Sequence, residues 1–310
     1  MWKISKGDHV LWVLGTLSPL PKNMQWQAHE VQQILAQAQQ VLDEPTVSMH
    51  ADIGFFGKLA LLPSLIGVRN NPDGKKLQDL MSAAEYARWL ALKAKYIGHD
   101  NGVEKQRPIF AAITLYLAAI EQVGLADKVI DPVIKLALKQ QRLKPTPVAF
   151  VIEVDNPRAL VKDFKHEPME DMDCFSKTLD HLESDIGLMR ERANAWSMGD
   201  LDWLRELPMS AQMDACKVAV TESGIARKLG VVDLGQKIET TWLAAASKAL
   251  DTNQVTFALL PIGHLLGSDN YPAKLKARGY RVELPDGLTE AVGDPMGVAP
   301  VSSATVSVRR

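Results

Sequence analysis

Cysteine is scarce in this sequence. Among 310 residues there are two cysteines, Cys174 and Cys216. No CxxC pair or other close spacing of cysteine with histidine is present, so we expect no structural zinc site. Two cysteines are equally compatible with a pair of buried thiols, which are common in cytosolic proteins, and with one disulfide, which requires an oxidising compartment. The cysteines alone leave the compartment open.

An excess of charge and a long apolar run are also missing. The chain has 35 basic and 37 acidic residues, a formal net charge of -2, and no block rich in Lys and Arg. We therefore expect no nucleic-acid partner. The longest apolar stretches, such as ALLPIGHLL and FAAITLYLAAI, fall short of the roughly 20 residues that span a bilayer, so we expect no membrane span.

The N-terminus, MWKISKGDHVLWVLG, contains neither the apolar core nor the cleavage site of a signal peptide. Two localisations follow from this. Either the protein is cytoplasmic, or its natural precursor carries a leader that this sequence lacks, which would make it periplasmic or secreted.

Several familiar catalytic motifs are absent as well. The sequence contains no GxGxxG, no GxxxxGK[ST] and no HExxH, the motifs of dinucleotide binding, P-loops and zinc proteases. Ser18 follows a predicted strand, but no GxSxG elbow surrounds it, so we do not expect a serine hydrolase.

What the sequence does contain is an alternation of strand and helix patterns. Apolar, β-rich segments predict strands at 9–17, 144–157, 254–261 and 280–284, and amphipathic segments predict helices at 28–42, 174–198 and 234–250. The apolar run VAFVI (148–152) is typical of a central strand covered on both faces. The pattern predicts an α/β fold with a mixed central sheet flanked by helices. We expect one domain over 1–284, with a helical cap or insertion at 46–146, and a loosely ordered tail at 285–310.

Three ionisable residues stand where predicted strands stop. His264 follows the apolar run ALLPIG, and Glu153 directly follows the run VAFVI. Glu44 precedes Pro45 at the end of a short predicted strand. Ligands of open α/β sheets bind at the carboxyl ends of the strands, so these side chains can converge on one rim, together with the Ser18 hydroxyl. Such a set resembles a divalent-metal site or a general acid–base site.

Each of these residues also has a purely structural interpretation. His264 can be a strand-end histidine whose nitrogens bond to the backbone. Glu153 can be a solvated residue or a helix cap, and Glu44 can be a turn carboxylate. The strand-end pattern alone leaves both interpretations open.

Four stretches resemble the TraB/GumN family, to which the Tiki-type metalloproteases are related. LWVLGTLSPLP resembles the N-terminal strand with its GxxH motif, and AQAQQVLDEP and VAFVIEV resemble two segments that each end in a glutamate. FALLPIGHLLGSDNYPAKLKARGYRVE resembles the C-terminal strand, histidine motif and helix. The likeness extends from about Met1 to Leu284. It implies a mixed α/β fold in which two histidines and a glutamate bind a divalent metal, and hydrolysis of peptide-like bonds.

The sequence departs from the family pattern at two positions of the site. Ser18 stands where the first histidine belongs, and Pro261 replaces a glycine of the second motif, whereas His264, Glu44 and Glu153 match. A serine hydroxyl is a poor substitute for imidazole at a borderline metal. The metal ligands that the resemblance implies are His264, Glu44 and Ser18, with Glu44, Glu153 and His264 as catalytic residues.

Three functions follow from the resemblance and its departures. The first is a pseudoenzyme or binding member with an impaired or altered metal site and no bound metal. The second is an active metal-dependent hydrolase, peptidase-like, that uses Mn, Co or Zn. The third is an accessory role in handling cell-surface polysaccharide. The ligand is expected to be peptide-like or saccharide-linked, and the substrate and the oligomeric state remain open. Because many bacterial members are secreted, the resemblance also predicts that Cys174 and Cys216 are bonded.

Overall fold

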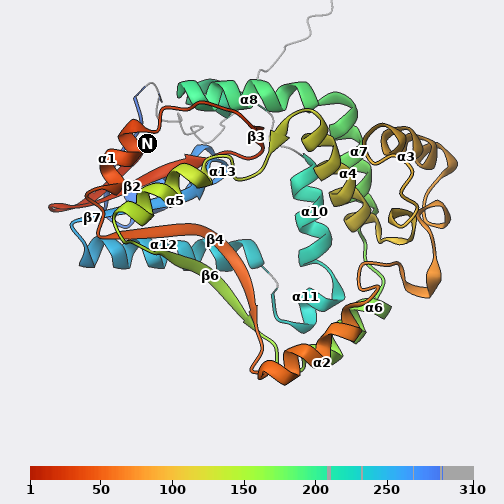
Figure 1. Cartoon of the computed structure of the whole chain (residues 1–310). Coiled ribbons are helices and arrows are strands. Elements are labelled where there is room, and N and C mark those ends of the chain that lie inside the picture. The colour runs from red at the N-terminus through yellow and green to blue at the C-terminus, as the bar shows by residue number, and fades with distance from the viewer. Residues whose placement is uncertain (208–210, 232, 268, 287, 289–310) are drawn as a thin grey trace, which may run out of the picture.

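The computed structural model describes residues 1–207, 211–231, 233–267, 269–286 and 288. The tail predicted from 285 onward lies almost wholly outside these residues. The expected α/β class is confirmed, since a mixed sheet is flanked by helices (Figure 1).

The central sheet has six strands in the order β6-β4-β7-β2-β1-β8. β2, β7, β4 and β6 run parallel, while β1 runs antiparallel to both β2 and β8. A second, two-stranded sheet pairs β3 with β5. The strand bounds are β1 Trp2–Lys6, β2 His9–Thr16, β3 Leu20–Pro21, β4 Gln40–His50, β5 Leu125–Ala126, β6 Pro145–Glu153, β7 Val255–Pro261 and β8 Arg281–Glu283.

Helices cover both faces of the sheet and form a separate group beside it (Figure 1). Figure 1 shows α12 along one face of the sheet and α1 and α5 over the other. The helix bounds are α1 His29–Leu35, α2 Phe55–Leu65, α3 Ala83–Tyr96, α4 Pro108–Gln122, α5 Asp131–Gln140, α6 Pro157–His166, α7 Met172–Ser184, α8 Ile186–Met198, α9 Leu201–Glu206, α10 Ala211–Thr221, α11 Gly224–Lys228, α12 Leu234–Thr252, α13 Gly263–Leu266 and α14 Tyr271–Ala277.

The two largest clusters of buried apolar residues in the described part of the chain are a sheet core and a helical core. The sheet core contains fully buried residues of the central strands, such as Leu11 and Phe257, with Trp242 of α12. The helical core lies among α3, α4 and α7 and contains Trp89 and Leu115. Burying apolar area in this way is the dominant favourable term in folding.

A buried ion pair fixes part of the helical core. Lys93 Nζ of α3 lies 2.7 Å from Glu104 Oε1, and both side chains are nearly inaccessible to solvent. Trp89 Nε1 donates to the same oxygen at 3.0 Å. Because the carboxylate is satisfied by two donors, its burial is tolerated.

Three sequence predictions of element bounds were wrong. The helix expected at 28–42 ends at Leu35, and the strand that follows does not stop at Glu44 but continues through Pro45 to His50. The single helix expected at 174–198 is divided into α7 and α8 at Asp185. The run VAFVI belongs to β6, which is an edge strand and not a central one. An edge strand can accept such a run because the neighbouring loops and helices cover part of it.

The disulfide between Cys174 and Cys216 is present. It joins α7 to α10, with the two Cα atoms 4.4 Å apart. The bonded state predicted from the resemblance is therefore confirmed.

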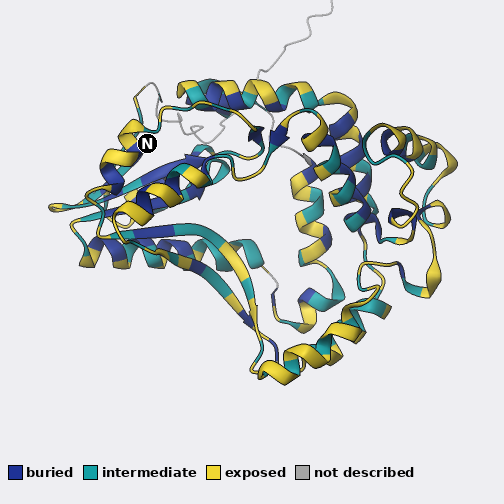
Figure 2. Ribbon diagram, in the orientation of Figure 1, coloured by how far each residue is buried: buried dark blue, intermediate teal, exposed yellow. Residues whose placement is uncertain are grey.

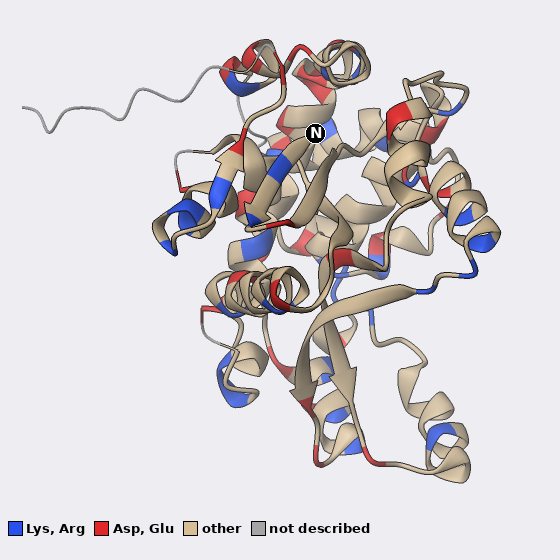
Figure 3. Ribbon diagram, turned by 90° about the vertical axis from the view of Figure 1, so that its left-hand side faces the viewer, with Lys and Arg blue, Asp and Glu red and all other residues tan. Residues whose placement is uncertain are grey.

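In the view of Figure 3, basic and acidic residues are interspersed along the chain. This distribution agrees with the near-zero net charge of the sequence. Among the helices that the structure describes, none is both long and apolar enough to cross a bilayer.

Candidate functional site

The candidate site lies where β2, β4 and β7 end or bend away from one another. Thr16, the last residue of β2, is buried and pairs with Pro261, the last residue of β7. Its hydroxyl Oγ1 donates to Glu44 Oε1 at 2.5 Å. The structure therefore brings Glu44 to the carboxyl edge of β2, although Thr16, and not Ser18, is the residue that contacts it.

Glu44 reaches this edge because β4 is irregular at this point. β4 pairs with β7 only as far as Leu42, and its pairing with β6 shifts register between Leu42 and Pro45. Proline lacks a backbone N–H and is accommodated in strands at such irregularities. Asp43 Oδ1 accepts the Glu44 amide at 3.0 Å. The irregularity leaves the half-buried Glu44 side chain free to meet Thr16.

His264 stands at the same edge, in the first turn of the short helix α13 that directly follows β7. The amide of Ile262 donates to the Thr16 carbonyl at 2.8 Å, which ties the start of this turn to the end of β2. The imidazole stacks on Tyr271 of α14 with ring centroids 4.7 Å apart. Burial lowers the pKa of His264, and the positive charge of Lys217 lowers this pKa further, while Glu239 opposes the shift.

Ser18 points to a different partner. It is exposed, and its hydroxyl donates to Asp127 Oδ1 at 2.6 Å. Asp127 directly follows β5, which pairs with β3 in the small second sheet. The Ser18 side chain thus helps to fasten the segment after β2 to that sheet.

Glu153 does not join the group. It is exposed at the end of β6 and pairs with His50, which lies six residues beyond Glu44 on β4. At the ordinary rise of a strand this separation along β4 corresponds to roughly 20 Å. The prediction that Glu153 ends a strand is confirmed, but the strand carries it away from the edge that holds Glu44 and His264.

The residues present fit a divalent metal poorly. Where the family resemblance requires an imidazole the chain offers the Ser18 hydroxyl, and this hydroxyl is already bonded to Asp127. Within the part of the chain that the structure describes, no three His, Cys, Asp or Glu side chains are grouped as a metal ion requires. A site with one imidazole and one engaged carboxylate lacks the donor set that a borderline metal prefers.

A cavity of about 660 Å³ adjoins the candidate site, and the sequence analysis did not find it. Its lining includes three tryptophans, which are Trp12 of β2, Trp196 of α8 and Trp26 of the segment before α1. The Trp196 indole donates to the Gly15 carbonyl at 2.7 Å, and the Trp26 and Trp196 ring centroids are 5.7 Å apart. The period-2 pattern of β2 was a usable signal for Trp12, but nothing in the sequence links it to Trp26 or Trp196.

Gly15 lies where the cavity and the candidate site meet. A Cβ at this position would lie 2.7 Å from Ile262 Cδ1 and 3.0 Å from Leu265 Cδ1. Both are buried or half-buried side chains that close the end of β7 against β2. The glycine of the GTLS segment therefore allows β2 and α13 to approach closely.

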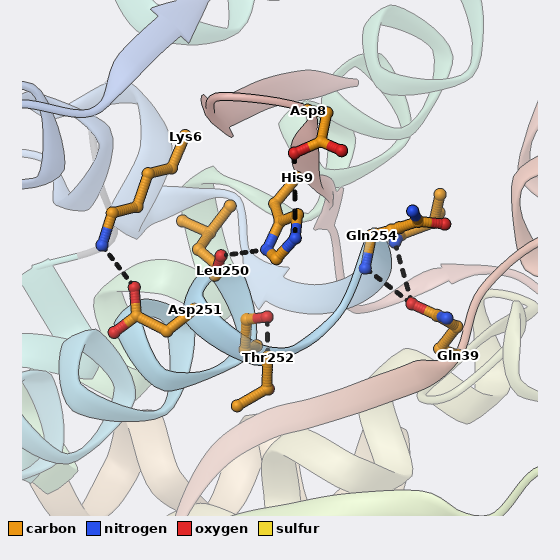
Figure 4. Close-up of polar contacts among 10 residues, drawn as sticks. Lys6, Asp8, His9, Gln39, Leu250, Asp251, Thr252 and Gln254 are labelled. Carbon is orange, nitrogen blue, oxygen red and sulfur yellow. Dashed lines mark hydrogen bonds and ion pairs between the residues drawn. The ribbon is translucent and has the colours of Figure 1, made fainter.

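The opposite edge of the sheet is occupied by structural polar contacts (Figure 4). There Gln39 Oε1 accepts the Gln254 amide at 2.6 Å, and the His9 imidazole Nδ1 lies 2.7 Å from the Leu250 carbonyl. Lys6 Nζ lies 2.5 Å from Asp251 Oδ1. The first contact joins the segments that precede β4 and β7, and the other two join the start of β2 and the end of β1 to the end of α12.

Comparisons with known proteins complete the description of the site. No curated protein and no solved structure is significantly similar to the chain. The model of the TraB/PrgY/gumN family matches residues 1–284, the span that contains every element described above. The chain therefore belongs to the TraB/PrgY/gumN family.

Proposed function

We propose that this protein is a binding member of the TraB/PrgY/gumN family whose metal-hydrolase site has been altered. The observation that carries the proposal is the hydrogen bond of Ser18. This residue takes the position of the first histidine, and its hydroxyl donates to Asp127. Glu44 is engaged by Thr16 in the same way. Both groups are committed to protein partners, which favours a structural or binding role over metal-dependent hydrolysis.

The proposal predicts that restoring the missing imidazole improves metal binding. We expect Ser18→His to bind Mn²⁺, Co²⁺ or Zn²⁺ at least about 10-fold more tightly than the parent chain, because losses in the ligand environment cost 10–100-fold. Isothermal titration calorimetry of the two purified proteins measures this difference. In the double variant Ser18→His/His264→Ala the gain should disappear.

The alternative of an active metal-dependent hydrolase makes the opposite prediction for the parent chain. It is favoured by one observation, that Glu44 and His264 stand at the same sheet edge. Stoichiometric Mn, Co or Zn in the purified parent chain, lost in His264→Ala, would overturn the binding proposal. An unchanged affinity in Ser18→His would show that position 18 does not face the shared rim.

The cavity indicates which ligand a binding member would take. Trp12, Trp26, Glu30 and Asp286 are among the residues that line one space. Flat aromatic surfaces with adjacent acceptors suit the apolar C–H faces and hydroxyls of a saccharide, and the volume is within the range of small-molecule sites. This favours the saccharide-linked ligand over a peptide-like one.

A fluorescence titration tests the saccharide assignment. We expect dextran or chitin oligosaccharides to change the intrinsic tryptophan emission, and Trp26→Ala to weaken the binding at least about 10-fold, because aromatic anchors dominate such sites. Trp203→Ala is the matched control, since Trp203 packs against the same core but does not line the cavity. Equal loss in both variants, or saturation by none of the sugars, would contradict the assignment.

A further inference from the structure

Helix α2 presents an unusual surface. None of its residues is buried, and Figure 2 shows much of the helix in the colour of exposed residues. Large apolar side chains are exposed along α2 and at Ile66, the residue that follows it. We call these side chains the apolar stripe; their exposed fractions are Phe55 74%, Phe56 82%, Leu59 53%, Leu62 55%, Leu65 44% and Ile66 77%. A surface helix normally turns such residues toward the core and polar residues toward water.

α2 has no side that is lined mainly by charged residues. α2 carries a single charge, Lys58, and its less exposed positions are Gly57, Leu61 and Ser64. These positions face the protein, where Arg158 of α6 donates to the Ala60 carbonyl at 3.3 Å. α2 is thus held by the molecule on its small-residue side and exposes its large residues.

The exposed area is large for a monomer. The six side chains of the apolar stripe present on the order of 600 Å², given that one aromatic side chain can bury 150–250 Å². The largest apolar patch of a typical monomer is about 300–600 Å² and is often functional. A patch at or above the upper end of this range indicates a surface that is covered by a partner.

The spacing within the apolar stripe favours a helix as that partner. Phe55, Leu59, Leu62 and Ile66 follow one another at intervals of four, three and four residues. This is the a/d spacing of two helices that pack along a narrow seam. A bilayer surface requires no such seam.

The apolar stripe is also complementary to itself. In an antiparallel pair centred between Leu59 and Leu62, Phe55 lies opposite Ile66 of the partner subunit, and Leu59 lies opposite Leu62 of the partner subunit. This two-fold relation is that of an isologous interface, in which the same patch of both subunits is used.

We propose that two copies of this chain form a symmetric dimer by packing their α2 helices antiparallel through the apolar stripe. Two stripes bury on the order of 1,200 Å² together, which exceeds the approximately 1,000 Å² that a specific interface needs. α2 lies at the far end of the long β4/β6 ribbon, away from β2 and α13, so the proposed contact leaves the candidate site and the cavity free (Figure 1). The inference is independent of the proposed function.

An anionic lipid surface is the other occupant to consider, and the charges nearby disfavour it. Asp52, Glu153 and Asp155 are exposed at the ends of β4 and β6 beside α2. Exposed Lys58, Arg158 and Lys162 lie beside them, so the charge at this end is mixed and lacks the excess of basic residues that anionic lipids attract. The membrane is therefore an outcome of the test and not the proposal.

Sedimentation velocity of the full chain between about 1 and 100 µM tests the dimer. We expect a concentration-dependent dimer whose dissociation constant rises about 30-fold or more in Leu59→Glu, as for the loss of a central interface residue. Leu136→Glu is the matched control, because Leu136 is 56% exposed on α5, outside the apolar stripe. It should leave the dimer intact, and far-UV circular dichroism verifies that both variants fold.

A pair of introduced charges tests the orientation of the two helices. Phe55→Lys should weaken the dimer, and the double variant Phe55→Lys/Ile66→Glu should recover part of the loss, because these two positions lie opposite each other in the antiparallel pair. A parent chain that is monomeric at 100 µM, or a dimer that Leu59→Glu does not weaken, would overturn the proposal. So would a monomeric chain that floats with phosphatidylserine-containing vesicles and loses this binding in Leu59→Glu.

Discussion

His264 is surrounded by groups that favour its neutral form. Tyr271 of α14 covers one face of the ring, Lys217 of α10 adds a positive charge nearby, and Glu239 of α12 acts in the opposite direction. Burial is the main reason that its pKa is lowered from the usual 6.5, and the charge of Lys217 is the second. The neutral imidazole is thus favoured, which is the form that binds a metal.

This environment predicts a specific loss of stability in acid. A histidine whose pKa is lower in the folded state binds fewer protons when folded, so its contribution is present above about pH 6.5 and is lost as the pH falls. We expect the metal-free protein to lose more unfolding free energy between pH 7.5 and pH 5 than the variant His264→Gln. Urea unfolding in the presence of EDTA measures both.

His99→Gln provides the comparison for this prediction, because His99 is an exposed residue in the loop after α3. Its pH dependence should match that of the parent chain. If His264→Gln also leaves the pH dependence unchanged, the ring is not held in its neutral form by burial.

At the scale of single elements, the sequence indicated whether a segment forms a helix or a strand better than it indicated where that segment begins and ends. β2 and β7 were predicted almost to the residue, because a strand in the middle of the sheet must bury apolar side chains over its whole length. The helix at 28–42 was predicted too long, since Val41 and Leu42 continue a helical spacing while they are buried in β4. Local periodicity does not distinguish these two ways of burying the same side chains.

The same limit explains the candidate site. Glu44 and His264 were predicted as site residues because each follows an apolar strand segment, which is a local feature of the sequence. Thr16, which holds Glu44, and the partner of Ser18 were not found. Their contacts depend on the irregularity of β4 and on the small β3–β5 sheet, and such pairings between distant segments leave no local signal.

At the scale of the whole molecule, the chain passes between its two cores and returns. Cys174 lies in α7, and the nearby α7 residues Phe175 and Leu179 belong to the helical core. The chain then adds Trp196 and Leu201 to the sheet core. At Cys216 the chain lies beside α7 again, and the disulfide links Cys216 to Cys174. The bond therefore holds together a segment that connects both cores.

We expect loss of this bond to destabilise the whole fold and not one helix. The disulfide joins residues 42 positions apart, and a loop of this size predicts a decrease of about 2–5 kcal/mol in unfolding free energy. Urea unfolding of Cys174→Ala/Cys216→Ala against the oxidised parent measures it, and the reduced parent should behave like the double variant. Two free thiols in an Ellman titration of natively exported protein, or a double variant as stable as the parent, would show that the bond does not stabilise the native chain.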